Sequence, residues 1–498
     1  MKDCILFSLP YSDQIYSPSL GLGVLKGHAY NAGFNVNIID LNIKYIDYLT
    51  KTTNSKNRKQ CLEFALTHFK ESLCLPNMPK HRIPCGLDEL FGFNLSFSEI
   101  DKMLDDIICK SFWPSLLKKI IFDKYEQTPV IGLSIMGQPQ VPFALLIGKL
   151  FKKYWPNTLV VAGGSHITLL KERIAEDAQY GKWIDLFLPG HCEKIFVDLL
   201  HSVKHKRDLP INGIIKFGSK FIEAKNLPIN DVLTPLYDKD DIEQYNSDNM
   251  FFPVQIRRGC SYGKCRFCTY RVIEECDKGV SVNKISRKIL TEISRWNPKR
   301  ITVRDSLMDY RGSIEFGKAC IDILPETIWR ISSKINNNFC REKNIKLLHS
   351  LNCRVLEFGV ETIHKHTQKL INKYHDVSMI EELFPIAASY GIKVQLNLMF
   401  GFPGETVEDC EKQLDWFFHW KNKYPSMLYG SFSMLDIIYG SIFASQSKQF
   451  GIKLQPLEPW TSIYIWNTPD WTKKFFKKLI VPENVVFNRS VHSELLYI

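Results

Sequence analysis

Three cysteines lie within nine consecutive positions of the stretch RRGCSYGKCRFCTYR, residues 257–271. Cys260, Cys265 and Cys268 can gather three thiolates on one short loop, and such thiolates bind an iron-sulfur cluster or a zinc ion. Packing as buried structural cysteines is less favoured, because the Arg and Lys residues that flank them make the loop too polar for a protein core. The spacing therefore indicates a metal site.

The two metal interpretations differ in what completes the site. A structural zinc ion needs a fourth ligand, and Cys276 is the one candidate nearby in the sequence. The chain contains no second C-x-x-C pair, so a cluster is favoured over zinc. A cluster bound by three cysteines leaves one iron open to a substrate or a cofactor.

The cysteine loop lies within a series of predicted strands. One strand ends directly before the loop, and the others follow it in the sequence. Six apolar runs alternate with helical stretches, which is typical of a full or partial TIM-like (β/α) barrel with its reactive groups at the carboxyl ends of the strands. The predicted strands are 251–256, 300–306, 328–335, 354–362, 392–404 and 428–438. The cysteines follow the first strand, so we expect the metal site at the catalytic end of the barrel.

An earlier alternation of strands and helices predicts a separate α/β domain. Its strands are expected at 4–10, 34–42, 129–136, 158–164 and 184–190. Strands that alternate with helices form a parallel sheet covered on both faces, here a doubly wound sheet of the flavodoxin or Rossmann kind. The ligand edge of such a sheet lies at the carboxyl ends of its strands, where Ser134, Gly163 and Gly164 fall.

These patterns divide the chain into expected domains. Residues 1–202 form the first α/β domain, and residues 43–128 within it lack strand signals and predict a helical insertion. The polar, charge-rich residues 203–247 are expected to be a linker. Residues 248–445 form the barrel, and residues 446–498 are a C-terminal extension that closes the barrel or contacts a substrate.

The composition of the chain limits which kinds of binding partner and which cellular location we expect. The formal net charge of +11 over 498 residues comes from scattered Lys and Arg. No basic stripe is interleaved with aromatic residues, so we expect no nucleic-acid partner. No window approaches the roughly 18 apolar residues of a membrane span, and the start of the chain lacks a signal-peptide pattern. We therefore expect a cytoplasmic protein with free thiols and one metal site.

The segment CSYGKCRFC, placed after a first barrel strand, resembles the signature of the radical SAM superfamily. The resemblance implies that the three cysteines hold a [4Fe-4S] cluster and that its open iron chelates S-adenosylmethionine (SAM). Phe267, which precedes the third cysteine, would then lie against the adenine. The spacing C-x4-C-x2-C departs from the commonest family form, C-x3-C-x2-C, by one residue.

Residues at the ends of the later strands resemble other cofactor-binding positions of the superfamily. By this resemblance, Asp305 would lie near the methionine amine, and Ser332 and Lys334 would reach the SAM carboxylate or ribose. Glu361 in GVET would bind the ribose hydroxyls or the amine, and Gly401, which begins GFPGET, would bring backbone close to adenine. Taken singly, Ser332 or Asp305 is more typical of a strand-end turn or a helix cap, but the order of the whole set after the cysteines reverses that preference.

The first domain resembles the cobalamin-binding domain that precedes the barrel in many radical SAM proteins. The similar segments are PSLGLGVLKGHAYNAGFNVNIIDLN, PVIGLSIM, VVAGGSHITLL and IDLFLPGHCEK. The resemblance implies cobalamin near Ser134, Gly163 and Gly164, although these glycines equally fit a plain tight turn. The motif D-x-H-x-x-G, which supplies a cobalt ligand elsewhere, is missing. His166 could be a ligand, but a lone histidine beside a turn is more often a polar surface residue, which is what we expect here.

Together the two resemblances imply a cobalamin-dependent radical SAM C-methyltransferase. Such an enzyme would act on an unactivated carbon of a peptide or other natural product, with an external electron donor of the flavodoxin or ferredoxin type. One alternative is a radical SAM peptide epimerase or cyclase with a vestigial cobalamin domain. The alternative of another class is a non-catalytic binding protein with a structural metal site.

Overall fold

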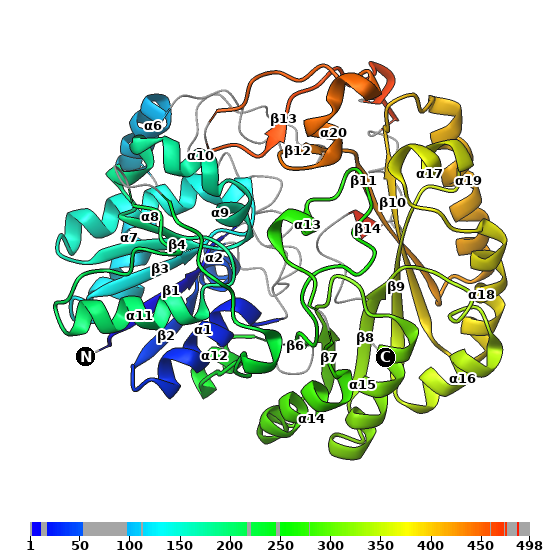
Figure 1. Cartoon of the computed structure of the whole chain (residues 1–498), viewed down its shortest axis with the longest axis horizontal. Helices are drawn as coiled ribbons and strands as arrows, with labels where there is room; N and C mark the ends of the chain where they lie inside the picture. The colour runs from blue at the N-terminus through cyan, green and yellow to red at the C-terminus, as the bar shows by residue number, and fades with distance from the viewer. Residues whose placement is uncertain are drawn as a thin grey trace. The chain divides into compact units, whose positions relative to one another are not determined.

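Two parallel β-sheets, each in a compact unit of its own, organise the chain (Figure 1). The first unit comprises Met1–Tyr245 and Gln455–Tyr464, and the second comprises Asn246–Leu454 and Ile465–Ile498. The computed structural model describes residues 2–10, 17–52, 97–110, 113–216, 221–245, 250–277, 279–458, 460–472, 474–475 and 486–487. Positions 53–96 of the predicted helical insertion and most positions after 475 in the predicted C-terminal extension lie outside these residues.

The sheet of the first unit has five parallel strands in the order β2-β1-β3-β4-β5. The strands are β1 (Cys4–Ser8), β2 (Val36–Asp40), β3 (Val130–Ser134), β4 (Leu159–Gly163) and β5 (Leu186–Leu188). Ser134 pairs in register with Ser8 on one side and with Gly163 on the other. This register brings the carboxyl ends of the three central strands to one edge. All five predicted strands are confirmed.

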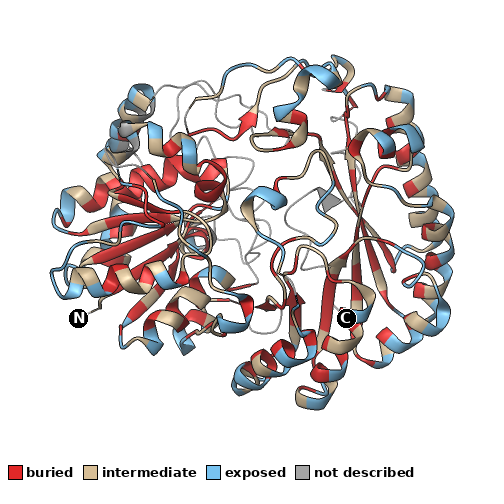
Figure 2. Ribbon diagram, in the orientation of Figure 1, coloured by how far each residue is buried: buried red, intermediate tan, exposed pale blue. Residues whose placement is uncertain are grey.

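Helices cover both faces of this sheet, with α1 and α11 on one face and α8 on the other (Figure 1). The helices are α1 (Leu20–Asn31), α2 (Leu41–Thr52), α6 (Phe97–Lys110), α7 (Trp113–Leu117), α8 (Val141–Tyr154), α9 (Ser165–Leu169), α10 (Lys171–Glu176), α11 (Glu193–Lys204) and α12 (Lys239–Glu243). Short 3-10 or π turns are η1 (Lys118–Phe122), η2 (Gln138–Gln140), η3 (Ala178–Lys182) and η4 (Ile229–Asp231). The strands and inner helix faces form the buried core (Figure 2).

Two segments from outside the predicted first domain pack against it. The buried ammonium group of Lys26 in α1 lies 2.6 Å from Asp238 and 2.5 Å from Asp241, which anchors residues 238–241. From the other segment, the backbone N–H groups of Ser462 and Ile463 donate to the side-chain oxygen of Gln138. The first unit therefore includes much of the predicted linker and ten residues from near the C-terminus.

The sheet of the second unit is parallel and runs β6-β7-β8-β9-β10-β11-β14. Its strands are β6 (Phe252–Val254), β7 (Arg300–Val303), β8 (Ile328–Ser333), β9 (Cys353–Glu361), β10 (Lys393–Phe400), β11 (Leu428–Met434) and β14 (Val486–Phe487). The first six match the six predicted strands in order, and β14 adds a short edge strand beside β11.

Eight helices are described in the second unit, and the longer ones among them line the outside of its curved sheet (Figure 1). They are α13 (Tyr270–Ile273), α14 (Val282–Ile293), α15 (Tyr310–Ile323), α16 (Glu342–Ser350), α17 (Lys365–Ile371), α18 (Val377–Ser389), α19 (Val407–Lys423) and α20 (Ile442–Ser445), with 3-10 turns η6 (Ser294–Trp296) and η7 (Ser447–Phe450). The two-residue strands β12 (Ile437–Ile438) and β13 (Ile463–Tyr464) complete the described elements. None of the described helices has both the length and the apolar character needed to cross a membrane.

Candidate cluster and cofactor site

The loop that carries Cys260, Cys265 and Cys268 runs from the end of β6 to the start of α13. Contacts with residues just after and within α17 hold it in place. The Tyr262 hydroxyl donates to the carbonyl oxygen of Asn372 at 2.7 Å, and the Asn372 side chain donates to the carbonyl oxygen of Lys264 at 3.1 Å. The loop is therefore fixed at the carboxyl end of the sheet, as predicted for a reactive group of this fold.

The three thiols influence one another electrostatically. Burial raises the pKa of Cys265 to about 12, the positive charge of Lys373 acts against this rise, and the Cys268 and Cys260 thiolates add to it. Burial also raises the pKa of Cys268. A bound cation would reverse this balance, because ligating thiols are deprotonated. As placed, no three Cys, His, Asp or Glu side chains among the described residues could together hold one metal ion; in a [4Fe-4S] cluster each thiolate meets a separate iron.

Four consecutive backbone amides lead into this loop, and each donates to a carboxylate from another part of the chain. Asp305 accepts from Ile256 (2.7 Å) and Arg257 (3.1 Å), Asp277 accepts from Arg258 (2.9 Å), and Glu274 accepts from Gly259 (2.8 Å). We call Glu274, Asp277 and Asp305 the carboxylate brace. Gly259 has φ +71°, and a Cβ there would lie 2.5 Å from the Cα of Cys276, so the loop needs glycine to pass this segment.

Asp305 follows β7 and is only 3% exposed. Burial raises its pKa to about 7, against the opposing effect of the two amides that it accepts from. Its second oxygen, Oδ2, has no hydrogen-bond partner among the described residues. Asp305 therefore accepts hydrogen bonds from the start of the cysteine loop. Its contact with the methionine amine stays a prediction.

Glu361 ends β9 and is paired with a lysine that the sequence did not single out. The Nζ atom of Lys373 lies 2.7 Å from Oε1 of Glu361, and both side chains are nearly buried. Burial opposes a charge on Lys373, but the negative charges of Glu361 and Cys265 raise its pKa overall. Glu361 adopts φ +64°, a backbone conformation that is uncommon for a residue with a side chain.

Ser332 and Lys334 lie at the carboxyl end of β8, as predicted. The Ser332 hydroxyl donates to Glu357 at 3.0 Å. The Lys334 ammonium group donates to the carbonyl oxygen of Tyr374 at 2.7 Å and lies 4.9 Å from the centre of the Tyr262 ring. Lys334 is therefore held near the cysteine loop, and burial together with the charge of Lys373 lowers its pKa.

Strands β8, β9 and β10 also carry a network of polar side chains that the sequence analysis did not predict. Glu357 on β9 pairs with Arg330 on β8 and accepts from the Asn397 side chain on β10 at 2.8 Å. Gln395 donates to Asn397 in turn. The signal was present in the sequence, because polar residues recur at every second position of apolar strands and so share one face.

Gly401 follows β10 with φ +81°, and its amide donates to the carboxylate of Glu405 at 2.8 Å. Glu405 also accepts from the amide of Phe402 at 3.1 Å, and burial raises the pKa of Glu405 to about 7. The Phe402 ring lies 6.3 Å from the ring of Phe267, edge to face. The turn that contains Gly401 is thereby brought to the predicted adenine-contacting aromatic of the cysteine loop.

In the first unit, Ser134, Gly163 and Gly164 lie at the carboxyl edge of the sheet, as predicted. Gly164 has φ +107°, and a Cβ there would lie 2.4 Å from the carbonyl oxygen of Ile135. The close approach that this glycine allows is therefore to the protein's own backbone. The order of the sheet switches direction between β1 and β3, where doubly wound sheets bind ligands. There, Gln140 donates to the carbonyl oxygen of Leu9.

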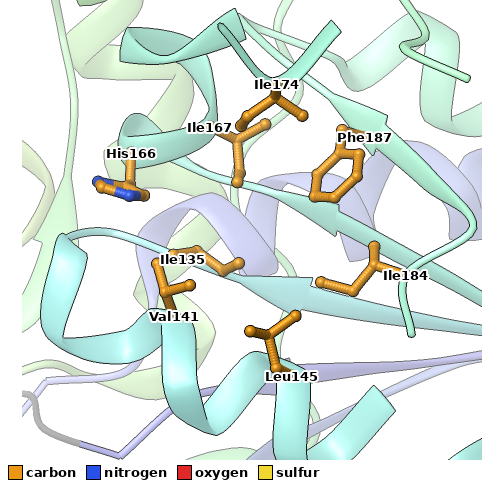
Figure 3. A pocket seen from close by; sticks show the side chains of 8 residues that line it. All are labelled: Ile135, Val141, Leu145, His166, Ile167, Ile174, Ile184 and Phe187. Atoms are coloured by element: carbon orange, nitrogen blue, oxygen red, sulfur yellow. The ribbon is translucent and has the colours of Figure 1, made fainter. Parts of the chain in front are cut away.

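The prediction that His166 is a surface residue was wrong. Its side chain is 3% exposed, and its Nε2 atom lies 3.0 Å from the carbonyl oxygen of Trp460. Burial lowers its pKa to about 4. The sequence did not reveal this burial because the segment that carries Trp460 lies almost 300 positions away. His166 borders a small pocket whose other lining residues are apolar, including Phe187 (Figure 3).

Residues 254–417 match the Radical SAM superfamily. An uncharacterized methyltransferase of Pyrococcus horikoshii is 24% identical over 280 residues, 54% of this chain and 59% of that protein. An anaerobic magnesium-protoporphyrin IX monomethyl ester cyclase of Cereibacter sphaeroides is 22% identical over 293 residues, 53% of this chain and 45% of that enzyme. The chain therefore spans less than two thirds of the length of either relative.

Two solved structures resemble nearly the whole chain. The radical S-adenosylmethionine methyltransferase TsrM from Kitasatospora setae, solved with cobalamin and a [4Fe-4S] cluster, has a TM-score of 0.61 at 15% identity and covers 97% of this chain and 92% of its own. The cobalamin-dependent S-adenosylmethionine radical enzyme OxsB has a TM-score of 0.60 at 13% identity and covers 95% of this chain and 65% of its own. At these identities the likeness concerns the fold, and it confirms the predicted fold class.

Proposed function

We propose that this chain, whose residues 254–417 match the Radical SAM superfamily, is a cobalamin-dependent C-methyltransferase that acts on an unactivated carbon of a peptide or other natural product. The observation that carries the proposal is that the resemblance to TsrM extends over both units and not only over the superfamily segment. TsrM is a methyltransferase solved with cobalamin, and the first unit here has the α/β fold that such a cofactor would need.

The second unit offers donors that fit the superfamily's cofactors. Cys260, Cys265 and Cys268 would hold a [4Fe-4S] cluster, which supplies the electron that cleaves SAM, while cobalamin supplies the methyl group that is transferred. Lys373 and Glu361 form a nearly buried ion pair, and both charges act on the Cys265 thiol, so a positive and a negative group would lie near a cluster held by these cysteines. These charges suit the carboxylate and the amine of an amino-acid ligand.

The remaining site assignments are part of the proposal. We assign Phe267 and the turn at Gly401 to the adenine, because their loops meet through Phe402. Ser332, Lys334 and Glu361 are assigned to the polar parts of SAM, and Asp305 to the positioning of the cysteine loop. The predicted domain division is kept as part of the proposal: 1–202 for cobalamin with a helical insertion, 203–247 as a linker, 248–445 for the radical SAM core and 446–498 as an extension. Within this division, residues 203–245 of the linker and Gln455–Tyr464 of the extension group with the first unit.

Features of the first unit support cobalamin without a histidine on cobalt. Gln138 lies just beyond β3 and is buried, and its Nε2 donor has no partner among the described residues. This donor is available to a ligand at the carboxyl edge of the sheet, and the amide-rich corrin is a ligand of suitable chemistry. His166 is already bonded to the Trp460 carbonyl.

The test is the set of products formed by anaerobically reconstituted enzyme with SAM, a reductant and candidate peptides. Methyl transfer through a substrate radical requires 5′-deoxyadenosine and S-adenosylhomocysteine together, with a product heavier by one methyl group. Mass spectrometry measures all three. Deoxyadenosine without S-adenosylhomocysteine, from protein that carries cobalamin and acts on its true substrate, would contradict the proposal and leave the superfamily chemistry intact.

One observation favours a second candidate function. The resemblance to the magnesium-protoporphyrin ester cyclase covers 53% of the chain, so a cyclase or epimerase with a vestigial cobalamin domain is the alternative. Such an enzyme would yield deoxyadenosine and an unmethylated product. Absence of a corrin spectrum from protein produced with cobalamin uptake would favour this alternative.

A further inference from the structure

Three segments around the cysteine loop contain basic residues and no acidic ones. Residues 257–273 hold five Lys and Arg, residues 362–375 hold three, and residues 437–454 hold two, while none of these segments contains Asp or Glu. The whole chain has 53 acidic and 64 basic residues, so these segments differ from its average composition, and acidic residues border them directly at Glu274, Glu361, Asp376 and Asp436. Each segment carries only a few charged residues, so the excess of basic residues becomes clear only when the three segments are considered together.

The fold brings these three segments together around Arg266. Its guanidinium group donates to the carbonyl oxygens of Leu370 at 2.7 Å and Lys369 at 3.3 Å, at the end of α17. On the other side, its carbonyl oxygen accepts from the amide of Phe443, and its guanidinium carbon lies 5.3 Å from the centre of the Phe450 ring. Arg266 thus links the cysteine loop to α17 and to the α20–η7 turn.

Six cations of these segments are exposed: Lys264, Arg271, Lys365, Lys369, Lys448 and Lys453. We call them the basic face. Lys264, Lys369 and Lys448 form no ion pair with any described residue, and Arg271 donates to the carbonyl oxygen of Gly440. Nearby, His366 is 3.6 Å from Asp409, so we leave it out of the basic face. Two members belong to the cysteine loop or to the helix directly after it, which sets these charges close to the cluster ligands.

We propose that the basic face is the docking site of an acidic electron-transfer protein that reduces the cluster. The proposal rests on the function proposed above, which requires an electron from outside the chain. In the step, the partner's reduced flavin or iron centre loses one electron and the oxidised cluster gains it; no bond forms or breaks. Positive charges around the entry point raise the encounter rate of a negative partner and orient it toward the cluster.

The test measures reduction of the cluster by reduced flavodoxin, an acidic flavoprotein, in anaerobic stopped flow. A triple variant, Lys264→Glu, Lys369→Glu and Lys448→Glu, reverses the charge of three members of the basic face, one from each segment. The matched control, Lys284→Glu, Lys318→Glu and Lys346→Glu, changes the net charge equally at exposed positions on α14, α15 and α16. Photoreduced deazaflavin, a small neutral reductant, reports whether the cluster of each variant is intact and reducible.

We expect the basic-face variant to react with flavodoxin about tenfold more slowly or worse at low salt, with the difference shrinking as added salt screens the charges. Its reduction by deazaflavin should equal that of the wild type, and the control should keep most of its flavodoxin rate. Equal flavodoxin rates in the two triple variants would overturn the proposal, as would a wild-type cluster that deazaflavin reduces and flavodoxin does not.

A tRNA competitor separates a nucleic-acid function of the same face. If tRNA binding is lost in the basic-face variant while its flavodoxin rate is unchanged, the face is a nucleic-acid site and the proposal is wrong. Failure of the proposed function is distinguishable, since it appears as missing methylated product from an enzyme whose cluster flavodoxin still reduces through this face.

Discussion

The ammonium group of Lys373 lies 2.7 Å from the carboxylate of Glu361, directly over a strand position that has no side chain. That position is Gly359 on β9, where a Cβ would lie 2.6 Å from both the Glu361 oxygen and the Lys373 nitrogen. The end groups of the ion pair occupy the space that a side chain at this position would take, so any larger residue would push them aside. The position of the Lys373–Glu361 pair therefore depends on Gly359 in strand β9 as well as on the segments that carry the two charged residues.

Replacement of Gly359 by alanine should displace this pair and weaken SAM binding about tenfold or more, since hydrogen bonds to charged groups are worth about 1.5–3 kcal/mol. Calorimetric titration of SAM into reconstituted protein measures the change. The matched control is Gly21→Ala, because a Cβ at Gly21 in α1 would meet nothing within 4 Å. If Gly359→Ala bound SAM as tightly as the wild type, the pair would have no part in the cofactor site.

Removal of the three loop cysteines tests the cluster assignment. Wild-type protein reconstituted without oxygen should hold about four irons per chain, and replacement of Cys260, Cys265 and Cys268 by alanine should abolish the brown chromophore. Cys276→Ala is the control, because this exposed cysteine lies on the neighbouring segment and would be needed only by a four-cysteine site. A cluster lost in Cys276→Ala, or stoichiometric zinc in the wild type, would contradict the assignment.

Glu405 should make the stability of the second unit depend on pH. Its pKa is about 7 in the folded protein and about 4.3 when unfolded, so the folded state holds the proton more tightly. Stability from this group is therefore full below about pH 4 and falls as the pH rises to about 7. Glu405→Gln removes this dependence, so its melting temperature relative to the wild type should rise between about pH 5 and pH 8.

Glu408→Gln is the control for this measurement, because Glu408 is exposed in the first turn of α19, the helix that begins two residues after Glu405. Its melting temperature should follow that of the wild type at both pH values. A relative melting temperature of Glu405→Gln that stays constant with pH would show that the carboxyl is ionised normally in the folded protein.

The strands were predictable because each is a short run of apolar residues between polar turns, and eleven predicted runs became eleven parallel strands. The position of the cysteine loop followed from chain order alone. Predicted ends extend beyond several strands: β6 stops at Val254, although the apolar run continues to Ile256. The reason is that the next amides bond to Asp305, a side chain, instead of to a neighbouring strand.

The partners of the site residues were not predictable in the same way. Lys373 follows a short helix and reads as a solvated lysine, but the fold buries it against Glu361. Lys26 likewise sits in a pattern typical of an exposed helix face and is buried by Asp241, more than 200 residues later. Such contacts depend on the folded path of distant segments, which neither periodicity nor local propensity encodes.

His166 supplies a test of the first unit. If cobalamin binds there without a protein histidine on cobalt, the electron paramagnetic resonance spectrum of the Co(II) form should be the same in wild type and in His166→Ala. The reason is that the ring is buried and its Nε2 atom is engaged by Trp460. Nitrogen splitting present in the wild type and lost in the variant would identify His166 as a cobalt ligand.

The carboxylate brace also bears on the reducing strength of the site. Amides that donate to the sulfurs of a cluster stabilise its reduced form and make it a weaker reductant. The absence of negatively charged groups around the cluster has the same effect. Here the amides of residues 256–259 are all occupied by Glu274, Asp277 and Asp305, which also bring carboxylates beside the loop. In a cluster held by Cys260, these four amides would not be available as donors to the sulfurs, which would favour a low reduction potential.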